Sequence, residues 1–388
     1  MIKTVNTINN LIKGNILSNR AYLGSNRVFP IDGSIDNTFE IGTGFSAGTR
    51  SIKIQTDGKV LVVGDFTSYN SITRNRIVRL NTDGSLDNTF SIGTGLNNFV
   101  TSIEIQSDGK IIVVGEFITY NSNARNRIVR LNTDGSLDNT FSIGTGFNNI
   151  VQSTKIQTDG KLIAGGAFTN YNGTGRNGIV RLNTDGSIDN TFNIGTGFDN
   201  NVLSIEIQTD GKIIAGGFFT NYNGTGRNNL VRINTDGTVD TSFTIGTGFN
   251  SGTYSIKIQP DGKVLVGGLF TDYNGNARNR MVRLNTNGSI DNTFNIGTGF
   301  NGIINSLILQ TDGKVLVVGD FTSYNSITRN RIVRLNTDGS LDNTFSIGTG
   351  LNNFTRPIEI QTDGKIIVGG SFTSYNGTGR NRIVRLYI

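Results

Sequence analysis

The sequence predicts an all-β chain that folds as a closed seven-bladed β-propeller with four-stranded blades. The triplet Asp-Gly-Lys first occurs at Asp57 and recurs every 51 residues, seven times in all. A second marker, Asp-Gly-Ser or a close variant, recurs with the same step from Asp32 onward. A fixed step of this kind indicates a repeat architecture. Seven units account for residues 32–388, which leaves residues 1–31 as a separate non-repeat segment.

Each unit contains four short segments with strand character. In one copy of the repeat, residues 102–106 alternate apolar and polar side chains. Residues 110–117 are almost continuously apolar, which indicates a strand buried on both faces. Residues 127–132 and 137–143 complete the set. Four strands in about 50 residues, without helical periodicity, are typical of a propeller blade.

Turn chemistry predicts the register between the third and fourth strands. A two-residue Asp-Gly turn would place a charge opposite an asparagine. A three-residue loop closed by Gly84 in the left-handed region instead pairs Leu80 with Leu86 and Arg79 with Asp87. This register matches apolar with apolar and charge with charge. We therefore expect the three-residue loop, with a buried or half-buried ion pair in every blade.

The phase of the repeat predicts how the ring closes. The first unit begins with its fourth strand, at residues 35–41, and the last unit ends with its third, at residues 382–388. Each segment alone would be an unpaired edge, so we expect the N-terminal strand to complete the last blade. Columns that hold one aromatic residue in every unit, such as Phe39, Phe66 and Tyr69, are expected in the core between blades.

The innermost strands carry alternating charges around the ring. The third residue of each strand reads, in order, Lys53, Glu104, Lys155, Glu206, Lys257, Ile308 and Glu359. Positive and negative residues cannot alternate all the way around a ring of seven blades. The neutral Ile308 stands where two like charges would otherwise be neighbours. We expect ion pairs between neighbouring blades, each contributing about 0–1 kcal/mol.

Composition excludes several classes of site. The chain contains no cysteine, histidine or tryptophan. It therefore lacks disulfides, thiolate metal sites and the commonest general base. The net charge is +6, but four basic columns supply 26 Lys and Arg while three acidic columns supply 20 Asp. A ring of this kind predicts a solvated, symmetric framework rather than a nucleic-acid-binding patch.

No motif predicts catalysis, a cofactor or a metal ion. Residues 81–87 superficially resemble a calcium loop, but the preceding alternate position is the cation Arg79, and turn chemistry explains the Asp and Gly. The Ile-Gly-Thr-Gly stretches lead into strands rather than helices, so they are not phosphate loops. Asp65, Glu116 and Asp320 share a column at the end of the second strand, where we expect solvated or capping residues. The expectation is a protein that is not an enzyme.

The N-terminal segment predicts an assembly anchor. Residues 1–31 have no uninterrupted apolar stretch and no small-residue cleavage site, so no signal peptide is expected. No run of the chain approaches the ~18 apolar residues of a membrane span. Residues 1–25 have too few apolar side chains for a core of their own, and we expect them to dock on other chains. The candidate anchor residues are Ile8, Leu11, Ile12, Ile16, Tyr22 and Leu23.

Two resemblances accompany these residues. Units such as IQPDGKVLVGGLFTDYNGNARNRMVRLNTNGSIDNTF resemble the delta-60 repeats, a bacterial and phage β-propeller family. This resemblance covers all seven units and implies the fold, but it brings no catalytic motif. The stretch AYLGSNRVFP, residues 21–30, is similar to short segments of phage tail and other virion proteins. Residues 55–99 and 310–354 are identical, which indicates recent exchange between copies.

The loops that join one unit to the next vary most. They comprise residues 46–50 and their equivalents, and we expect them on the same face as the loops between second and third strands. Loops held by a rigid scaffold often carry function, although loops also tolerate variation without selection. The candidate recognition residues are Arg50, Phe99, Ile150, Asn201, Tyr254, Ile303, Phe354, Arg74, Arg125, Arg176, Arg227, Arg278, Arg329 and Arg380.

Three functions follow as hypotheses. The first is a phage virion protein on the tail or capsid, assembled in the host cytoplasm, which docks through residues 1–25 on other virion proteins. Its propeller would serve particle architecture or bind a host-surface glycan or protein. The second is a bacterial binding or scaffold module for protein or glycan. The third, least favoured, is a propeller hydrolase or lyase with a polar pocket around asymmetric acids. Neither nucleic acid nor membrane insertion is expected.

Overall fold

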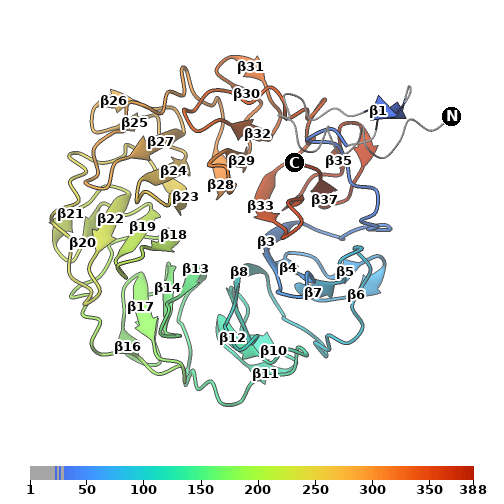
Figure 1. The fold of residues 1–388 in the computed structure, drawn as a ribbon. Helices are drawn as coiled ribbons and strands as arrows, with labels where there is room; N and C mark the ends of the chain where they lie inside the picture. The colour runs from blue at the N-terminus through green and yellow to red at the C-terminus, as the bar shows by residue number, and fades with distance from the viewer. Residues whose placement is uncertain (1–21, 24–25, 28–29) are drawn as a thin grey trace, which may run out of the picture.

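The computed structural model describes residues 22–23, 26–27 and 30–388, and it shows seven blades arranged in a ring (Figure 1). All regular elements of the described residues are β-strands, which confirms the predicted all-β propeller. Strands β1 (Tyr22–Leu23) and β2 (Asn26–Arg27) pair with each other outside the ring. Of the predicted anchor, Ile8, Leu11, Ile12 and Ile16 lie outside the described residues.

Each blade is built on a three-stranded antiparallel sheet. The inner strands, nearest the axis, are β3 (Thr49–Ile54), β8 (Val100–Ile105), β13 (Val151–Ile156), β18 (Val202–Ile207), β23 (Thr253–Ile258), β28 (Ile304–Leu309) and β33 (Thr355–Ile360). The second strands are β4 (Val60–Gly64), β9 (Ile111–Gly115), β14 (Leu162–Gly166), β19 (Ile213–Gly217), β24 (Val264–Gly268), β29 (Val315–Gly319) and β34 (Ile366–Gly370). The third strands are β7 (Ile77–Leu80), β12 (Ile128–Leu131), β17 (Ile179–Leu182), β22 (Leu230–Ile233), β27 (Met281–Leu284), β32 (Ile332–Leu335) and β37 (Ile383–Leu386).

A short hairpin, which the sequence patterns did not predict, interrupts the connection between second and third strands. The hairpins are β5 (Ser68–Tyr69) with β6 (Ile72–Thr73), β10 (Thr119–Tyr120) with β11 (Asn123–Ala124), β15 (Asn170–Tyr171) with β16 (Thr174–Gly175), β20 (Asn221–Tyr222) with β21 (Thr225–Gly226), β25 (Asp272–Tyr273) with β26 (Asn276–Ala277), β30 (Ser323–Tyr324) with β31 (Ile327–Thr328), and β35 (Ser374–Tyr375) with β36 (Thr378–Gly379).

The fourth element of each blade is an outer segment rather than a regular strand. In the second blade, the expected strand at 137–143 pairs with β12 through the single bridge Leu131↔Leu137. The next carboxylate, Asp138, accepts hydrogen bonds from the Thr140 amide at 2.9 Å and the Thr140 hydroxyl at 2.7 Å. Such local side-chain bonds favour a turn over a continued ladder, so the segment leaves the sheet after one bridge.

The predicted register of the third strand and the outer segment is confirmed. Leu80 bridges Leu86, and Gly84 adopts a φ of 88° in the three-residue loop. Arg79 Nε donates to Asp87 Oδ2 at 2.6 Å, with 8% and 4% of the two side chains exposed. The pair is therefore buried. It recurs in all seven blades.

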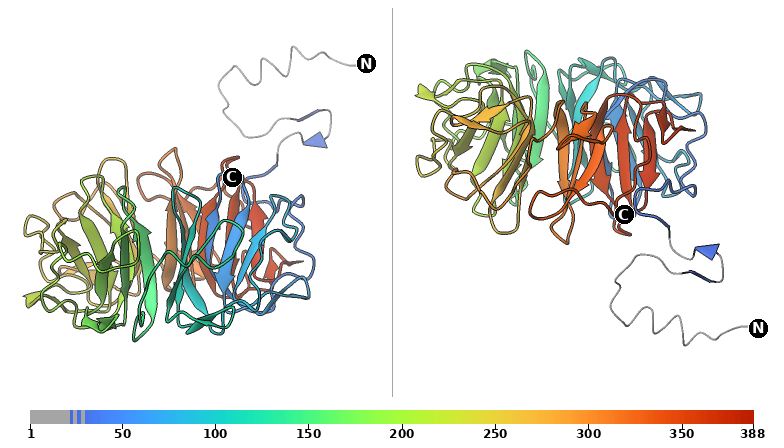
Figure 2. Two further views of the ribbon diagram at one scale, coloured as in Figure 1. Left: turned by 90° about the horizontal axis from the view of Figure 1, so that it is seen from below. Right: turned by 90° about the horizontal axis from the view of Figure 1, so that it is seen from above.

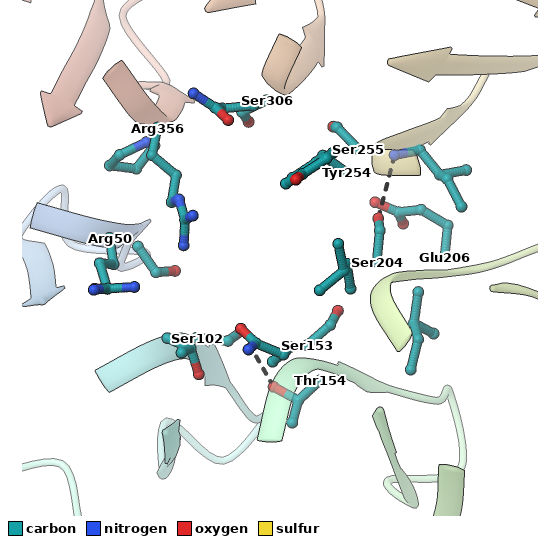
Figure 3. Close-up of a pocket in the computed structure, with 18 of the residues that line it drawn as sticks. Arg50, Ser102, Ser153, Thr154, Ser204, Glu206, Tyr254, Ser255, Ser306 and Arg356 are labelled. Carbon is teal, nitrogen blue, oxygen red and sulfur yellow. Dashed lines mark hydrogen bonds between the residues drawn. The ribbon is translucent and has the colours of Figure 1, made fainter. Parts of the chain in front are cut away.

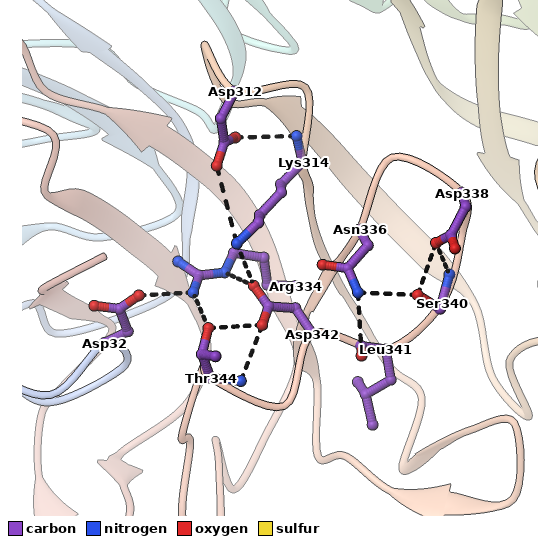
Figure 4. Close-up of polar contacts among 10 residues, drawn as sticks. All are labelled: Asp32, Asp312, Lys314, Arg334, Asn336, Asp338, Ser340, Leu341, Asp342 and Thr344. Carbon is purple, nitrogen blue, oxygen red and sulfur yellow. Dashed lines mark hydrogen bonds and ion pairs between the residues drawn. The ribbon is translucent and has the colours of Figure 1, made fainter. Parts of the chain in front are cut away.

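Each of these carboxylates is the centre of a small polar cluster, shown for the sixth blade in Figure 4. Asp342 accepts from Arg334 Nε at 2.7 Å and lies 2.9 Å from Lys314 Nζ. Burial favours a higher pKa for Asp342, but hydrogen bonds from Thr344 and Lys314, with the Arg334 charge, outweigh it and lower the pKa. A carboxylate satisfied in this way stays charged inside the blade.

The ring closes as the repeat phase predicted. Ile35 bridges Leu386 of β37, and the Asp36 amide donates to the Arg385 carbonyl at 2.9 Å. Asp36 and Arg385 then form the ion pair of the last blade at 2.7 Å. The N-terminal outer segment thereby completes the C-terminal sheet, and the described residues before it leave the ring near the C-terminus (Figure 2).

Apolar side chains fill the spaces between blades. The cluster at the closure joins Phe39, Phe66 and Tyr69 to Ile367 and Ile383 of the last blade. The three aromatic side chains are at most 3% exposed, which confirms their predicted core position. The Tyr69 hydroxyl also satisfies a buried carbonyl, that of Gly84, at 2.6 Å. Burial of this kind holds each blade to the next.

Candidate functional site

The two faces of the ring are defined by their loops. We call the lower face the one that carries the Asp-Gly turns at Asp57 and Asp83, which line a common shallow pocket. The upper face carries the connections that lead from one blade into the next, residues 46–48 and their equivalents. The central channel opens on the upper face at the start of the inner strands.

Every inner strand has a β-bulge at this upper end. In β3 the pairing with β4 shifts register between Thr49 and Ser51, so Arg50 is left out of the ladder. A bulge re-aims the side chain of its extra residue, and bulges are common beside functional sites. The bulged residues around the ring are Arg50, Thr101, Gln152, Leu203, Tyr254, Asn305 and Arg356. All seven line one cavity.

A glycine at the end of each second strand makes the bulge possible. Gly64 lies opposite Thr49, and a Cβ on Gly64 would overlap the carbonyl oxygen of Gly48. The same close approach occurs at Gly217, where the oxygen belongs to Asn201. Only glycine allows the two backbones to come this close. The bulge is therefore encoded in every repeat.

The cavity at the upper mouth has a volume of about 430 Å³. Its wall has three levels: the bulged residues at the opening, a ring of serines with one proline below them, and the charged residues deeper in the channel. Figure 3 shows side chains from several blades directed into this space. A volume in this range suits a small molecule rather than a macromolecular segment.

The deeper charges form the predicted inter-blade pairs. Lys53 Nζ lies 3.4 Å from both Glu104 and Glu359. Lys155 bridges Glu104 and Glu206 at 3.7 and 3.2 Å, and Lys257 reaches Glu206 at 2.8 Å. The chain of pairs stops at Ile308, as expected. Burial opposes the charge on Lys53, but the surrounding carboxylates raise its pKa.

Arg50 is held between a carboxylate and an aromatic ring. Its Nε lies 2.7 Å from Asp65 Oδ1, and its guanidinium carbon lies 4.4 Å from the centre of the Phe99 ring. Asp65 was expected to be solvated or capping; it is instead the ion-pair partner of a cavity residue. Cation–π contact and ion pairing together fix the position of Arg50.

Arg356, in the blade next to Arg50, has a different environment. Its guanidinium carbon lies 5.5 Å from the centre of the Phe354 ring. Within the described part of the chain, it forms neither an ion pair nor a hydrogen bond. Burial and the Arg50 charge lower the pKa of Arg356, against the effect of Asp65, Tyr254 and Asp320. An incompletely compensated cation at a cavity is a common mark of a binding site.

Tyr254 and Phe218 form an aromatic wall. Their rings meet edge to face, 5.7 Å apart at 83°. Phe218 is 36% exposed, which is unusual for a large aromatic side chain in this protein. Burial raises the pKa of the Tyr254 hydroxyl, so this group is neutral and can donate a hydrogen bond.

The predicted recognition residues fall into two groups. Arg50, Asn201 and Tyr254 line the cavity. Phe99 and Phe354 support the two cavity arginines, whereas Ile150 and Ile303 are half-buried next to the bulges. The sequence prediction missed the bulged column as a set. The sequence did carry a usable signal for this column. The variable position comes directly after the residue that pairs with an invariant glycine, as Arg50 follows Thr49 opposite Gly64.

The predicted arginines of the second-to-third-strand loops lie elsewhere, toward the outside of the blades. Arg125, Arg176, Arg278 and Arg380 reach the side-chain oxygens of Asn139, Asn190, Asn292 and Asn37, which belong to the outer segments. Their equivalents are Arg74, Arg227 and Arg329. None of these seven lines the cavity described here.

Metal ligands do not gather in the described residues. In residues 30–388 and the two short N-terminal strands, no three Asp or Glu side chains form a group that could hold a metal ion. The same part of the chain contains no helix long and apolar enough to cross a membrane.

Comparison with known proteins agrees with this architecture. The family described as "Domain of unknown function (DUF5122) beta-propeller" matches residues 55–90, 106–141, 157–192, 208–243, 259–294, 310–345 and 361–386. The chain belongs to the DUF5122 β-propeller family. The expectation of a β-propeller repeat family is thereby confirmed. A comparison with curated protein sequences finds no match.

Solved structures similar to this DUF5122 propeller share its fold at low identity. The WD40 β-propeller domain of Doa1 is 14% identical with a TM-score of 0.57, and the match covers 92% of this chain and 96% of that one. An extracellular domain of BT4673 from B. thetaiotaomicron is 16% identical with a TM-score of 0.54; the match covers 91% of this chain but 39% of that one. A catalytically inactive variant of virginiamycin B lyase from Staphylococcus aureus is 19% identical with a TM-score of 0.50, covering 89% and 97%.

Proposed function

We propose that this DUF5122 propeller is a binding module whose ligand site is the upper mouth of the channel. One observation carries the proposal. The framework columns repeat with little change in seven blades, yet the bulged column that lines the cavity holds six different residue types. A rigid symmetric scaffold that presents an asymmetric set of side chains is an arrangement suited to recognition.

A non-enzymatic role is the better interpretation of the same site. The inactive lyase among the similar structures carries an alanine in place of a histidine. This chain contains no histidine, so a histidine-dependent reaction has no counterpart here. The acids that line the cavity, Glu104, Glu206 and Glu359, and the nearby Asp65 are all held in ion pairs with Lys or Arg, which makes each a poor general base.

A unique fluorophore tests the proposed site. The chain has no tryptophan, so Leu203→Trp places a single reporter at the mouth. Ile327→Trp, at an outer hairpin residue that is 45% exposed, is the matched control. Titration with a library of small molecules and oligosaccharides should change the emission of the first variant only. The proposal is wrong if no compound does so, or if every active compound changes both variants alike.

A virion location is a second hypothesis, supported by the resemblance of residues 21–30 to phage segments. The geometry is compatible with it, because the described residues 30–33 join the ring at the lower face and leave the upper mouth open. Deletion of residues 1–25 should then leave a cooperative β-rich melt but abolish incorporation into purified particles. Normal incorporation, or an unfolded ring, would contradict an anchor. A bacterial binding or scaffold module is the alternative setting for the same propeller.

A further inference from the structure

The two cavity arginines lie on one side of the mouth. Arg50 and Arg356 come from the first and last blades, which are neighbours at the closure, and both line the cavity (Figure 3). Two guanidinium groups beside each other repel, and Asp65 pairs directly with Arg50 alone. Arg356 therefore remains a half-buried cation that forms no direct ion pair with the described residues, although the Asp65 and Asp320 charges act on it.

Burial of an uncompensated charge is costly. Leu203 and Gln152 occupy equivalent bulge positions, so the fold does not need a cation there. The arginine is thus a property of this blade rather than a requirement of the propeller. A negatively charged group that enters the cavity would relieve both the repulsion from Arg50 and the missing pairing of Arg356.

The remaining wall favours a ligand with a flat apolar body. Phe218 and Leu203 line the cavity from the fourth blade, and Tyr254 lines it from the fifth, so the aromatic wall spans the boundary between two blades. Gln152 and Asn201 supply neutral hydrogen-bonding groups on the same rim. Arginine on one side and an aromatic edge on the other match a molecule with a charged end and a ring.

We propose that the upper mouth binds a small organic oxyanion, a carboxylate or phosphate ester on a flat apolar ring, with Arg356 as the principal anion contact. This inference rests on the proposed binding function and specifies its ligand class. Arg50 is the second contact. The ligand competes with Asp65 for the Arg50 guanidinium group, and this competition lowers the affinity. Tyr254 and Phe218 hold the ring.

The experiment uses the full chain with Leu203→Trp and three probes: benzoate, phenyl phosphate and benzamide. Benzoate and phenyl phosphate should change the emission saturably, and the tighter of the two identifies the oxyanion. Benzamide, the neutral counterpart, should need at least a tenfold higher concentration. Arg356→Gln should raise the Kd of the tighter oxyanion at least tenfold. Arg127→Gln, which removes an equal charge from a side chain bound to the Phe147 carbonyl, should leave it within twofold.

A variant that should bind more tightly separates an effect on the site from a loss of folding, because an unfolded protein cannot gain affinity. Asp65→Asn removes the carboxylate that competes for Arg50, so it should lower the Kd severalfold while the melt stays cooperative. The inference is overturned if benzamide binds as tightly as the oxyanions, if neither oxyanion binds, or if Arg356→Gln has no effect. It is also overturned if Asp65→Asn weakens binding. Saturable binding of neutral compounds at Leu203→Trp would meanwhile leave the proposed binding function standing.

Discussion

Replacement of Asp36 by asparagine tests how the ring is closed. The Asp36 carboxylate accepts from Arg385 at 2.7 Å, from the Thr38 amide and hydroxyl at 3.0 and 2.7 Å, and from the Tyr387 hydroxyl at 2.9 Å. The variant leaves Arg385, 5% exposed, without its carboxylate. Breaking one partner of a buried pair costs about 3–5 kcal/mol.

Asp189→Asn is the matched control, because the same pair occurs within the third blade between Asp189 and Arg181, which are eight residues apart. There a three-residue loop keeps the outer segment next to its strand even after the pair is lost. At the closure, the pair joins residues 349 apart in sequence, and no such loop holds the segment. We expect similar losses of global stability but local opening only in Asp36→Asn.

Hydrogen exchange distinguishes the two variants. The amides of Gly33, Asp36 and Tyr387 donate across the closure. In Asp36→Asn their exchange should accelerate by roughly two to three and a half powers of ten, since about 1.4 kcal/mol corresponds to tenfold. In Asp189→Asn, the Asp189 amide should accelerate no more than the rest of its blade. Equal local acceleration in both variants would refute the idea that this pair secures the ring.

Three further predictions concern the framework. The seven buried carboxylates, represented by Asp87, have lowered pKa values, so the stability that they contribute is complete above about pH 5. This contribution declines as the pH falls below the ordinary aspartate pKa of 3.8. Thermal melts at decreasing pH should show the loss, and an unchanged melting temperature down to about pH 2 would contradict it. Ile308→Lys gives the new charge one attractive neighbour, Glu359, and one repulsive neighbour, Lys257, so the free energy of unfolding should change by no more than about 1 kcal/mol in chemical denaturation. A gain above about 2 kcal/mol would refute the idea that a seven-membered ring cannot pair every charge. Gly217→Ala should destabilise the protein by about 1–3 kcal/mol, because the added Cβ overlaps a backbone carbonyl oxygen. Gly226→Ala, whose Cβ would have no atom within 4 Å, should be neutral or slightly stabilising. Equal melting temperatures of the two variants would contradict the argument that the bulge requires glycine.

Local chemistry was sufficient to predict the framework. The constant step of 51 residues specified seven blades, and the turn at Gly84 specified the register that pairs Arg79 with Asp87. The first is a periodicity of the whole chain, and the second depends only on residues close together in it. The charged inner column was also predictable, because a repeat places equivalent residues side by side around a ring.

Other features depended on competition that sequence patterns do not reveal. The fourth strand was predicted from its apolar residues, but in the second blade the Asp138 side chain binds the Thr140 amide and ends the ladder after one bridge. The small hairpins, such as β10 with β11, lie in loops without strand periodicity. In both cases local hydrogen bonds decide between alternatives that hydrophobic pattern alone leaves equal.

The cavity shows most clearly what tertiary structure decides. Asp65 and Asp320 occupy identical stretches of 45 residues, yet Asp65 pairs with Arg50 while Asp320 receives a hydrogen bond from Asn305. Burial raises the pKa of Asp320 despite that bond. The partner in each case comes from the inner strand just before the identical stretch, and the neighbouring blade completes the surroundings. By itself the sequence determined the ring and the variable loops that lead into the bulged column. Only the tertiary structure showed that Arg50 pairs with Asp65 while Arg356 forms no ion pair among the described residues, because side-chain packing around the bulges decides these contacts.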